Sequence, residues 1–481
     1  MSSNSKLHAA ILSSPGMGHL IPVLELGKRL IADLDVAVTI FTMSSSTSQA
    51  ESQAIKAATT KLRVVELPPV DISGLVDTHT AVVTCLAVMM REIRPAFLSA
   101  LRHMAFPPTM LIVDLFGTES LPIGDELGIP KFVYVASNAW FLSLTTYCPT
   151  LDKEVEGEYV EQIEPLKIPG CRPVRQEDVV DPMLDRTNEQ YFEYIRICAE
   201  ITLGDGILVN TWEELQPSTL AAFRDEKLLG GVTKMVPVYP IGPLTRKVQS
   251  SRPIVNRDLF DWLDKQPSES VIFVCLGSGG TLSYEQMTEM AWGLELSQQR
   301  FIWVVLPPTT KSADAAFFTS GNGDGDLSYL PEGFLTRTRD VGMVVPLWAP
   351  QVDILGHPSV GGFFSHCGWN STLESVTNGV PMIAWPLYAE QRMNATLLTE
   401  ELGVAVRSEV PPWKKVVGRE EIQRMVRKIM VEKDGFKIRD RVKELKLGGE
   451  KALREGGSSY SALSQVLSKA MQDIKKIRAC K

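Results

Sequence analysis

Short apolar runs alternate with helix-length amphipathic segments along the first half of the chain. The first run, residues 8–14, ends in a glycine-containing turn, and apolar residues then recur at helical spacing as far as Leu34. The other strand-like runs of this half are 36–43, 62–67, 110–114, 131–135 and 206–210. Strands that alternate with helices in this way predict parallel sheets that are covered by helices on both faces.

The same pattern begins again after a polar stretch at residues 246–256, which we interpret as an interdomain linker. The strand-like runs of the second half are 271–276, 301–306, 343–347, 361–364, 381–385 and 403–407. A glycine turn at 277–280 and a helix-like segment at 284–297 follow the first of these runs, and residues 307–326 form a polar excursion.

The chain is therefore predicted to be an α/β protein with two doubly wound domains. The first domain spans residues 1–245, the linker 246–256 and the second domain 257–458. Residues 459–477 have helical spacing, and we expect the C-terminal helix in segment 459–481 to return to the first domain. Ligands of such sheets bind outside the carboxyl ends of the strands, so we expect the site in the cleft between the two domains.

Composition narrows the class of protein further. Of 481 residues, 44% are hydrophobic and 22% are charged, a balance that excludes global disorder. The net charge of −8 argues against nucleic acid as a partner, and no apolar run reaches the length of a membrane span. The N-terminus has no charged and then apolar leader, so we expect a cytoplasmic protein, and we expect a monomer.

Cysteines and acidic residues give no support for a disulfide framework or a metal site. The seven cysteines are scattered and odd in number, and no zinc-binding motif occurs. The acidic pair Asp324 and Asp326 lies within the polar excursion, where a solvated loop is the better interpretation. We therefore expect no metal.

Two glycine turns raise the question of a dinucleotide site. The turn at 16–18 has Ile21 where a third small residue is required, and no acidic residue follows the second strand. The turn at 277–279 has Leu282 in the third position. These departures disfavour a nicotinamide dehydrogenase. The turn at 277–280 can still present backbone N–H groups and the Ser278 hydroxyl to an anion, although an ordinary tight turn explains it equally well.

His19 stands at the mouth of the first strand–helix turn, where a ligand can reach it. Asp114 ends the fourth strand at the same carboxyl edge of the predicted sheet. A histidine that binds a buried aspartate through one nitrogen can take a proton with the other, and the aspartate stabilises the imidazolium that forms. Taken singly, each residue also fits a simpler interpretation, as a structural histidine and as a helix N-cap.

The segment 348–391 contains most of the side chains that could bind a nucleotide sugar. A strand ends near Phe364, and the following turn leads into a helix that begins with Asn370 and Ser371, where a diphosphate is stabilised by the helix dipole and by backbone N–H groups. His366 can donate to the same phosphates, and Glu374 can accept from ribose hydroxyls. Trp348 offers a face for a base, and sugar hydroxyls have partners in Glu390 and Gln391.

This segment resembles the diagnostic box of the plant UDP-dependent glycosyltransferases, and every position usually diagnostic for that box is present. The resemblance extends over essentially the whole chain, through motifs at 13–22, 113–118, 206–215, 239–243 and 261–264. Within the family, the chain is most similar to the phenolic and monolignol glucosyltransferases, the group that includes hydroquinone glucosyltransferases. The resemblance implies a GT-B fold of two Rossmann-like domains, with the acceptor in the N-terminal domain and the nucleotide sugar in the C-terminal domain.

Carried over position by position, the resemblance implies that His19 is the general base and Asp114 its partner. The implied donor-binding residues are Ser137, Ser278, Trp348, Ala349, Gln351, His366, Trp369, Asn370, Ser371, Glu374, Glu390 and Gln391. Ser137 stands where many relatives carry Thr, and Gln391 in place of His is typical of enzymes that prefer UDP-glucose to UDP-galactose. The candidate acceptor-binding residues are Leu115, Phe116, Trp140, Phe141 and Ala389, of which the first four fit a core position equally well.

The predicted function is inverting transfer of glucose from UDP-glucose to a hydroxyl of a small phenolic acceptor. UDP-glucose would be the co-substrate, with no further cofactor. The alternatives are a nucleotide-sugar binding protein without catalysis, and a glycosyltransferase with another UDP-sugar or a non-phenolic acceptor.

Overall fold

The computed structural model describes residues 6–43, 49–60, 62–77, 79–248, 257–309 and 325–479. The chain divides into two compact units: the first is Met1–Leu244 with Lys451–Lys481, and the second is Thr245–Glu450. Most of the predicted linker (249–256), most of the polar excursion (310–324) and Asp324 lie outside the described residues.

The first unit contains a seven-stranded parallel sheet in the order β3-β2-β1-β4-β5-β6-β7. Its strands are β1 (His8–Leu12), β2 (Ala37–Met43), β3 (Arg63–Leu67), β4 (Met110–Asp114), β5 (Lys131–Val135), β6 (Ile207–Val209) and β7 (Val238–Pro240). Its helices are α1 (Met17–Leu34), α2 (Gln49–Ala58), α3 (Val82–Glu92), α4 (Arg94–Arg102), α5 (Pro122–Leu127), α6 (Ala139–Glu154), α7 (Glu189–Glu200), α8 (Pro217–Arg224), α9 (Leu229–Val232) and α18 (Ser458–Ala479).

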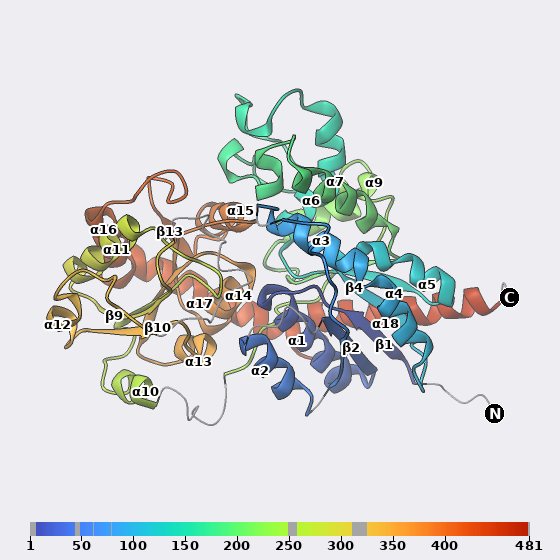
Figure 1. The fold of residues 1–481 in the computed structure, drawn as a ribbon, viewed down its shortest axis with the longest axis horizontal. Helices are drawn as coiled ribbons and strands as arrows, with labels where there is room; N and C mark the ends of the chain where they lie inside the picture. Colours follow the sequence, from blue (N-terminus) through green and yellow to red (C-terminus); the bar gives the residue numbers. More distant parts are fainter. Residues whose placement is uncertain are drawn as a thin grey trace. The chain divides into compact units, whose positions relative to one another are not determined.

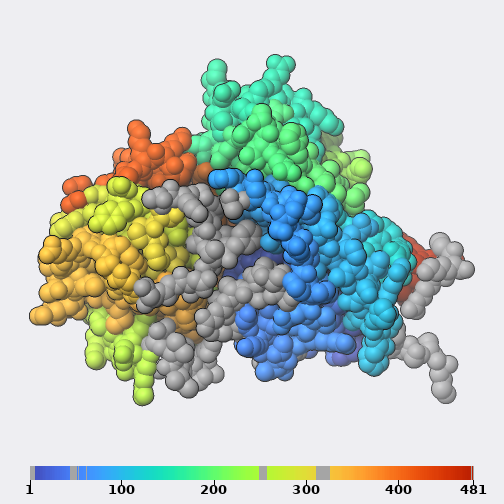
Figure 2. All heavy atoms as spheres, viewed as in Figure 1, coloured from blue at the N-terminus to red at the C-terminus, as the bar shows by residue number. Residues whose placement is uncertain are grey.

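The central strands of this sheet are buried on both faces, which explains why they are continuous apolar runs. Alternate residues of β1 point to two separate cores: Ala9 and Ile11 pack with α1 and α18, whereas Ala10 and Leu12 pack with α4 and α6. The helices inserted between β5 and β7, drawn in teal and green, lie together in the first unit (Figure 2).

The C-terminal helix α18, drawn in red, lies among the elements of the first unit (Figure 1). It packs against β7 and contributes Leu463, Val466 and Leu467 to the core that also contains residues of α1. The start of this helix is held by the Ser459 hydroxyl, which donates to the carbonyl oxygen of Gly242 at 2.5 Å. The end of the chain therefore completes one face of the sheet with which the chain begins.

The second unit contains a six-stranded parallel sheet in the order β10-β9-β8-β11-β12-β13. Its strands are β8 (Val271–Cys275), β9 (Arg300–Val305), β10 (Gly342–Pro346), β11 (Val360–Ser365), β12 (Met382–Ala384) and β13 (Ala405–Arg407). Its helices are α10 (Arg257–Leu263), α11 (Tyr284–Ser297), α12 (Phe334–Thr338), α13 (Gln351–Leu355), α14 (Trp369–Asn378), α15 (Gln391–Thr396), α16 (Arg419–Met430) and α17 (Lys433–Leu453).

The structure confirms the predicted α/β class and differs from the predicted elements mainly at their ends, by one or two residues. β7 is missing from the sequence prediction, whereas the equally short strands β6, β12 and β13 were predicted because they lie in longer apolar runs. In the described part of the chain, no helix combines the length and the apolar character that crossing a membrane requires.

Candidate active site

Each sheet reverses its strand order at one point, and several of the predicted site residues follow the strands that meet there. In the first sheet, the reversal lies between β1 and β4, which are neighbours. Loops that leave the carboxyl ends of such strands in opposite directions form a ligand-binding crevice. His19 lies in the first turn of α1, directly after β1, and Asp114 is the last residue of β4.

His19 and Asp114 are in contact at this point of the first sheet. Nδ1 of His19 lies 2.7 Å from Oδ2 of Asp114, and the exposed fractions of the two side chains are 20% and 0%. Oδ1 of Asp114 has no hydrogen-bond partner among the described residues. A buried carboxylate with so few partners strongly favours a positive charge nearby. The arrangement therefore suits an imidazole that gains a proton on Nε2.

The charge of Asp114 affects the pKa of the neighbouring Tyr134. Tyr134 is the β5 partner of Asp114 in the sheet register and is fully buried. Burial raises the pKa of the Tyr134 hydroxyl well above its usual value, and the charge of Asp114 raises it further. Tyr134 is thus a neutral neighbour and adds no second negative charge beside Asp114.

The turn that carries His19 needs a glycine. Gly16, which precedes α1, has φ 100°, a conformation that residues with a Cβ rarely adopt. Its N–H donates to Oε1 of Glu51 on α2 at 3.0 Å. Glu51 is buried and was not predicted as a site residue. Its carboxylate fixes the start of the helix that presents the histidine.

The predicted acceptor residues of the first unit separate into two kinds. The ring of Phe116 meets the His19 ring edge to face, with centroids 5.3 Å apart, and both Phe116 and Phe141 are half-buried. Leu115 and Trp140 are buried, and Leu115 belongs to the core. Ser137 is also buried, just beyond the end of β5. Phe116 is the aromatic side chain that the structure brings to the imidazole.

In the second sheet, the reversal lies between β8 and β11. The glycine turn 277–280 follows β8, and the turn that contains His366 follows β11 and leads into α14. No side chain caps α14 at Gly368. By contrast, the side chain of Ser283 accepts from Gln286 N and caps α11. The first-turn N–H groups of α14, rather than those of α11, therefore suit an anion.

His366 is buried between these two turns. A Cβ at Gly277 would lie 2.6 Å from the His366 ring, and Gly277 has φ +80°, so this position requires glycine. Burial lowers the pKa of His366 to about 4, which makes the ring neutral at pH 7. Nδ1 of His366 has no hydrogen-bond partner among the described residues. The ring can therefore serve a ligand as a neutral donor.

A hydrogen-bond network joins α13 to α14. The amide nitrogen Nε2 of Gln351 donates to Ser371 Oγ at 2.9 Å and to Glu374 Oε2 at 2.7 Å. Both N–H groups of this amide are thus used, which leaves the Gln351 oxygen as an acceptor for a ligand. Because the Ser371 oxygen accepts, its own O–H remains a donor. Glu374 is 2% exposed, so its carboxylate is almost removed from water.

Five further residues predicted to bind the sugar donor lie just before α13, after β8 and at the start of α14. Trp348 is 46% exposed and Ala349 is buried, and together they precede α13. Ser278 is exposed on the glycine turn, whereas Trp369 is buried in the first turn of α14, beside the half-buried Asn370.

Gln391 is buried at the start of α15, and its side-chain oxygen accepts from the N–H groups of Leu387 and Tyr388 at 2.9 and 3.1 Å. Its NH2 group is consequently the part that can reach a sugar. The half-buried neighbours Glu390 and Ala389 precede it, and Ala389 has φ 56°.

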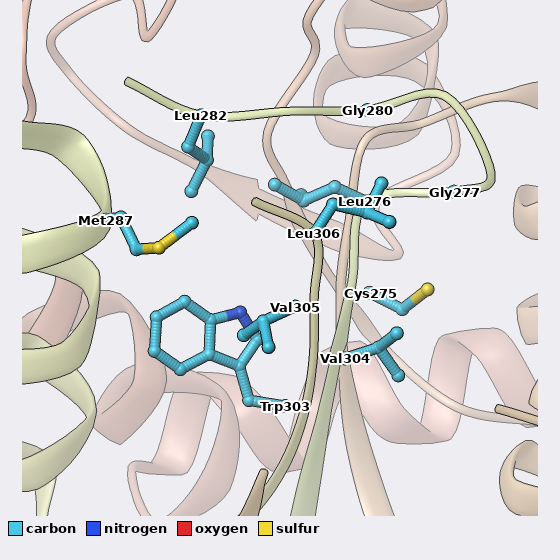
Figure 3. A pocket seen from close by; sticks show the side chains of 10 residues that line it. All are labelled: Cys275, Leu276, Gly277, Gly280, Leu282, Met287, Trp303, Val304, Val305 and Leu306. Carbon is cyan, nitrogen blue, oxygen red and sulfur yellow. The ribbon is translucent and has the colours of Figure 1, made fainter. Parts of the chain in front are cut away.

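A small pocket lies beside the glycine turn, and its walls are mostly apolar (Figure 3). It is lined by Cys275, Leu276, Gly277, Gly280, Leu282, Met287, Trp303, Val304, Val305 and Leu306. Burial raises the pKa of the Cys275 thiol to about 11, so it is uncharged. The pocket has no side chain that could hold a phosphate. The glycine turn forms one part of its wall.

Comparisons with known proteins agree with this arrangement. A family profile described as UDP-glucoronosyl and UDP-glucosyl transferase matches residues 247–430. The chain is 64% identical over 464 residues to anthocyanidin 3-O-glucosyltransferase 5 of Manihot esculenta, which covers 96% of this chain and 95% of the relative. The chain belongs to the UDP-glycosyltransferase family. It is therefore a transferase enzyme, as the sequence resemblance predicted.

Two further proteins are similar to this UDP-glycosyltransferase over nearly its whole length. Hydroquinone glucosyltransferase of Rauvolfia serpentina is 41% identical over 469 residues, covering 96% of this chain and 97% of the relative. The crystal structure of TcCGT1 in complex with UDP superposes with a TM-score of 0.91 at 50% identity, covering 98% of this chain and all of that one. The predicted GT-B fold is confirmed by this similarity.

In this UDP-glycosyltransferase, sequence reasoning missed Glu51 and Arg246. Arg246 pairs with Glu374 from a position 128 residues earlier in the chain, within the segment predicted as a linker. Neither residue belongs to a motif that would have singled it out. Among the described ranges, no group of three or more His, Cys, Asp or Glu side chains is suited to hold a metal ion.

Proposed function

We propose that the enzyme transfers glucose from UDP-glucose to a hydroxyl group of a small phenolic acceptor, with inversion at the anomeric carbon. The observation that carries the proposal is the contact of 2.7 Å between His19 and the fully buried Asp114. The names of the relatives support the acceptor class, because anthocyanidins and hydroquinone are both phenols.

In the proposed mechanism, Nε2 of His19 removes the proton from the acceptor hydroxyl. Asp114 stabilises the imidazolium that forms, as a buried aspartate does for a catalytic histidine. A phenol, with a pKa near the value of about 10 for tyrosine, loses its proton to a histidine far more easily than an aliphatic alcohol does. The oxygen then attacks the anomeric carbon, and the bond from this carbon to the diphosphate breaks on the opposite side.

The second unit would bind the donor. Trp348 would stack on uracil and Ala349 would bind it through the backbone, while Gln351 and Glu374 would accept from the ribose hydroxyls. The leaving diphosphate would be stabilised by the N–H groups at the start of α14, by the hydroxyls of Ser278 and Ser371, by Asn370 and by the neutral His366. Trp369, Glu390 and the NH2 group of Gln391 would hold the sugar, and Ser137 would lie near the sugar phosphate.

The test is a mass-spectrometric assay with UDP-glucose and a panel of acceptors that includes hydroquinone, coniferyl alcohol, scopoletin, a flavonol and an anthocyanidin. The matched control is 1,4-cyclohexanediol, which presents two hydroxyls like hydroquinone but lacks the acidity of a phenol. We expect a product heavier by one hexose, with release of UDP, for at least one phenol and not for the cyclohexanediol. Equal turnover of both compounds would contradict the role of phenol acidity, and UDP-glucose binding without product on any phenol would contradict the proposed acceptor class.

A further inference from the structure

Glu374 has a second partner besides Gln351. Nε and Nη2 of Arg246 lie 3.2 and 3.1 Å from Oε1 of Glu374, on the carboxylate oxygen that Gln351 does not contact. The Glu374 side chain is 3% exposed, and that of Arg246 is 36% exposed. A guanidinium thus holds a carboxylate that is almost completely removed from water.

The three N–H contacts fix the orientation of this carboxylate. An ionised carboxylate offers about four acceptor positions, and Arg246 and Gln351 use three of them. Gln351, the first residue of α13, holds one carboxylate oxygen, and Arg246 holds the other. A buried charge left with only the amide of Gln351 would be poorly compensated, and its side chain would be free to turn.

We infer that Arg246 is a positioning residue for recognition of the donor nucleotide. It holds the carboxylate of Glu374 so that a remaining acceptor position faces a ribose hydroxyl. This inference rests on the proposed donor site, in which Glu374 accepts from the ribose. Arg246 does not touch the reacting atoms in this scheme, and it acts through Glu374.

Two simpler roles would leave a different signature. If Arg246 merely stabilised the fold, its loss would weaken every ligand to the same extent. If it attracted the diphosphate by charge, its loss would likewise weaken any nucleoside diphosphate equally, because this interaction does not involve the ribose. Only a role through Glu374 makes the loss specific to the ribose hydroxyls.

The experiment measures binding of UDP and of 2′,3′-dideoxyuridine diphosphate by calorimetry to the full chain and to Arg246→Gln. For the unchanged chain, we expect UDP to bind much more tightly than the dideoxy compound. In Arg246→Gln, we expect UDP to bind about tenfold more weakly, the effect of losing one charge-assisted interaction, while the dideoxy compound changes by less than about twofold. Glu374→Gln should remove the same preference, and Arg246→Gln added to it should have no further effect.

The matched control is Arg337→Gln, which breaks an ion pair with the more exposed Glu295 in the second unit and removes an arginine that is about as exposed as Arg246. It should leave both affinities unchanged. Arg246→Lys, which keeps the charge but not the guanidinium geometry, should give an intermediate ribose preference and covers the case in which Arg246→Gln does not fold.

Equal weakening of both ligands, or no weakening of either, would overturn the inference and leave the proposed function in place. An unchanged chain that binds UDP and the dideoxy compound equally would overturn the ribose role of Glu374, and the role of Arg246 with it.

Discussion

The two units each contain a histidine in contact with an aspartate, and the two pairs differ in what surrounds them. In the first unit, Asp114 is fully buried and lies 2.7 Å from His19. In the second unit, Nε2 of His357 lies 3.1 Å from Asp264, whose side chain is 40% exposed. Nδ1 of His357 is also engaged, by the hydroxyl of Ser359 at 2.8 Å.

The two pairs have the same kind of contact but different burial, and we expect burial to decide which of them serves in catalysis. Water can solvate Asp264, so its carboxylate needs the imidazole little, and both nitrogens of His357 are occupied by the protein. Asp114 has no access to water, so a proton gained by His19 would compensate its charge. The first pair also lies where the strand order reverses, which brings it to the ligand-binding edge of the sheet.

The largest effect should come from His19→Ala. We expect kcat on a phenol to fall about 10³- to 10⁴-fold, the upper part of the range for a lost general base, whereas UDP should bind within about twofold of its original affinity. Steady-state kinetics with calorimetry of UDP binding would check this. If the variant kept kcat within tenfold, the base would have to be another group. The buried pair would then have no more part in the reaction than we expect of the exposed pair.

Asp114→Asn should have the next largest effect. The amide keeps the shape of the side chain but cannot stabilise an imidazolium, so we expect kcat to fall about 10²- to 10³-fold with little change in KM for UDP-glucose. Asp264→Asn is the matched control, and its kcat should stay within twofold. Similar losses in both variants would show that the burial of Asp114 does not set it apart.

His366 is a third case to compare with His19 and His357. It is buried, and no carboxylate pairs with it in the described part of the chain. Its pKa is lowered to about 4 by burial, from 6.5. Between these values the unfolded chain binds a proton that the native chain does not, so stability falls as the pH is lowered from 6.5 towards 4, by about 3 kcal/mol.

Urea unfolding of the unchanged chain and of His366→Asn between pH 4 and 7 would measure this contribution. The variant should lose most of that dependence on pH. Parallel curves for the two proteins would mean that His366 takes up its proton at an ordinary pH.

His357→Ala should have the smallest effect. Removing the imidazole takes one hydrogen-bond partner from Ser359 and leaves Asp264 to be solvated by water. We therefore expect the free energy of unfolding to fall by about 1 kcal/mol. The kcat should remain within twofold, which kinetics on the same preparation would show. A loss of activity without a loss of stability would be the unexpected result, since it would give the second pair a role in the reaction.

The sequence predicted the strands well because buried parallel strands are continuous apolar runs, and β4 and β5 have the predicted bounds. It placed His19 and Asp114 at the same edge of a sheet. That they touch depends on β1 and β4 being neighbours, and strand order leaves no local trace in the sequence. The same holds for Glu51 and Arg246, because one charged residue in a polar stretch has no periodic pattern to mark its partner.

The return of the C-terminal helix to the first unit has a consequence for synthesis on the ribosome. The first unit ends at Leu244 and is completed only from Lys451 onward, so about 200 residues are translated in between. At about 5–20 residues per second, this interval is roughly 10–40 s. During this time the apolar surface of α1 and β7 that will receive Leu463, Val466 and Leu467 stays uncovered on the nascent chain, open to chaperones. A chain truncated before Leu463 would thus lose packing in the unit that was made first.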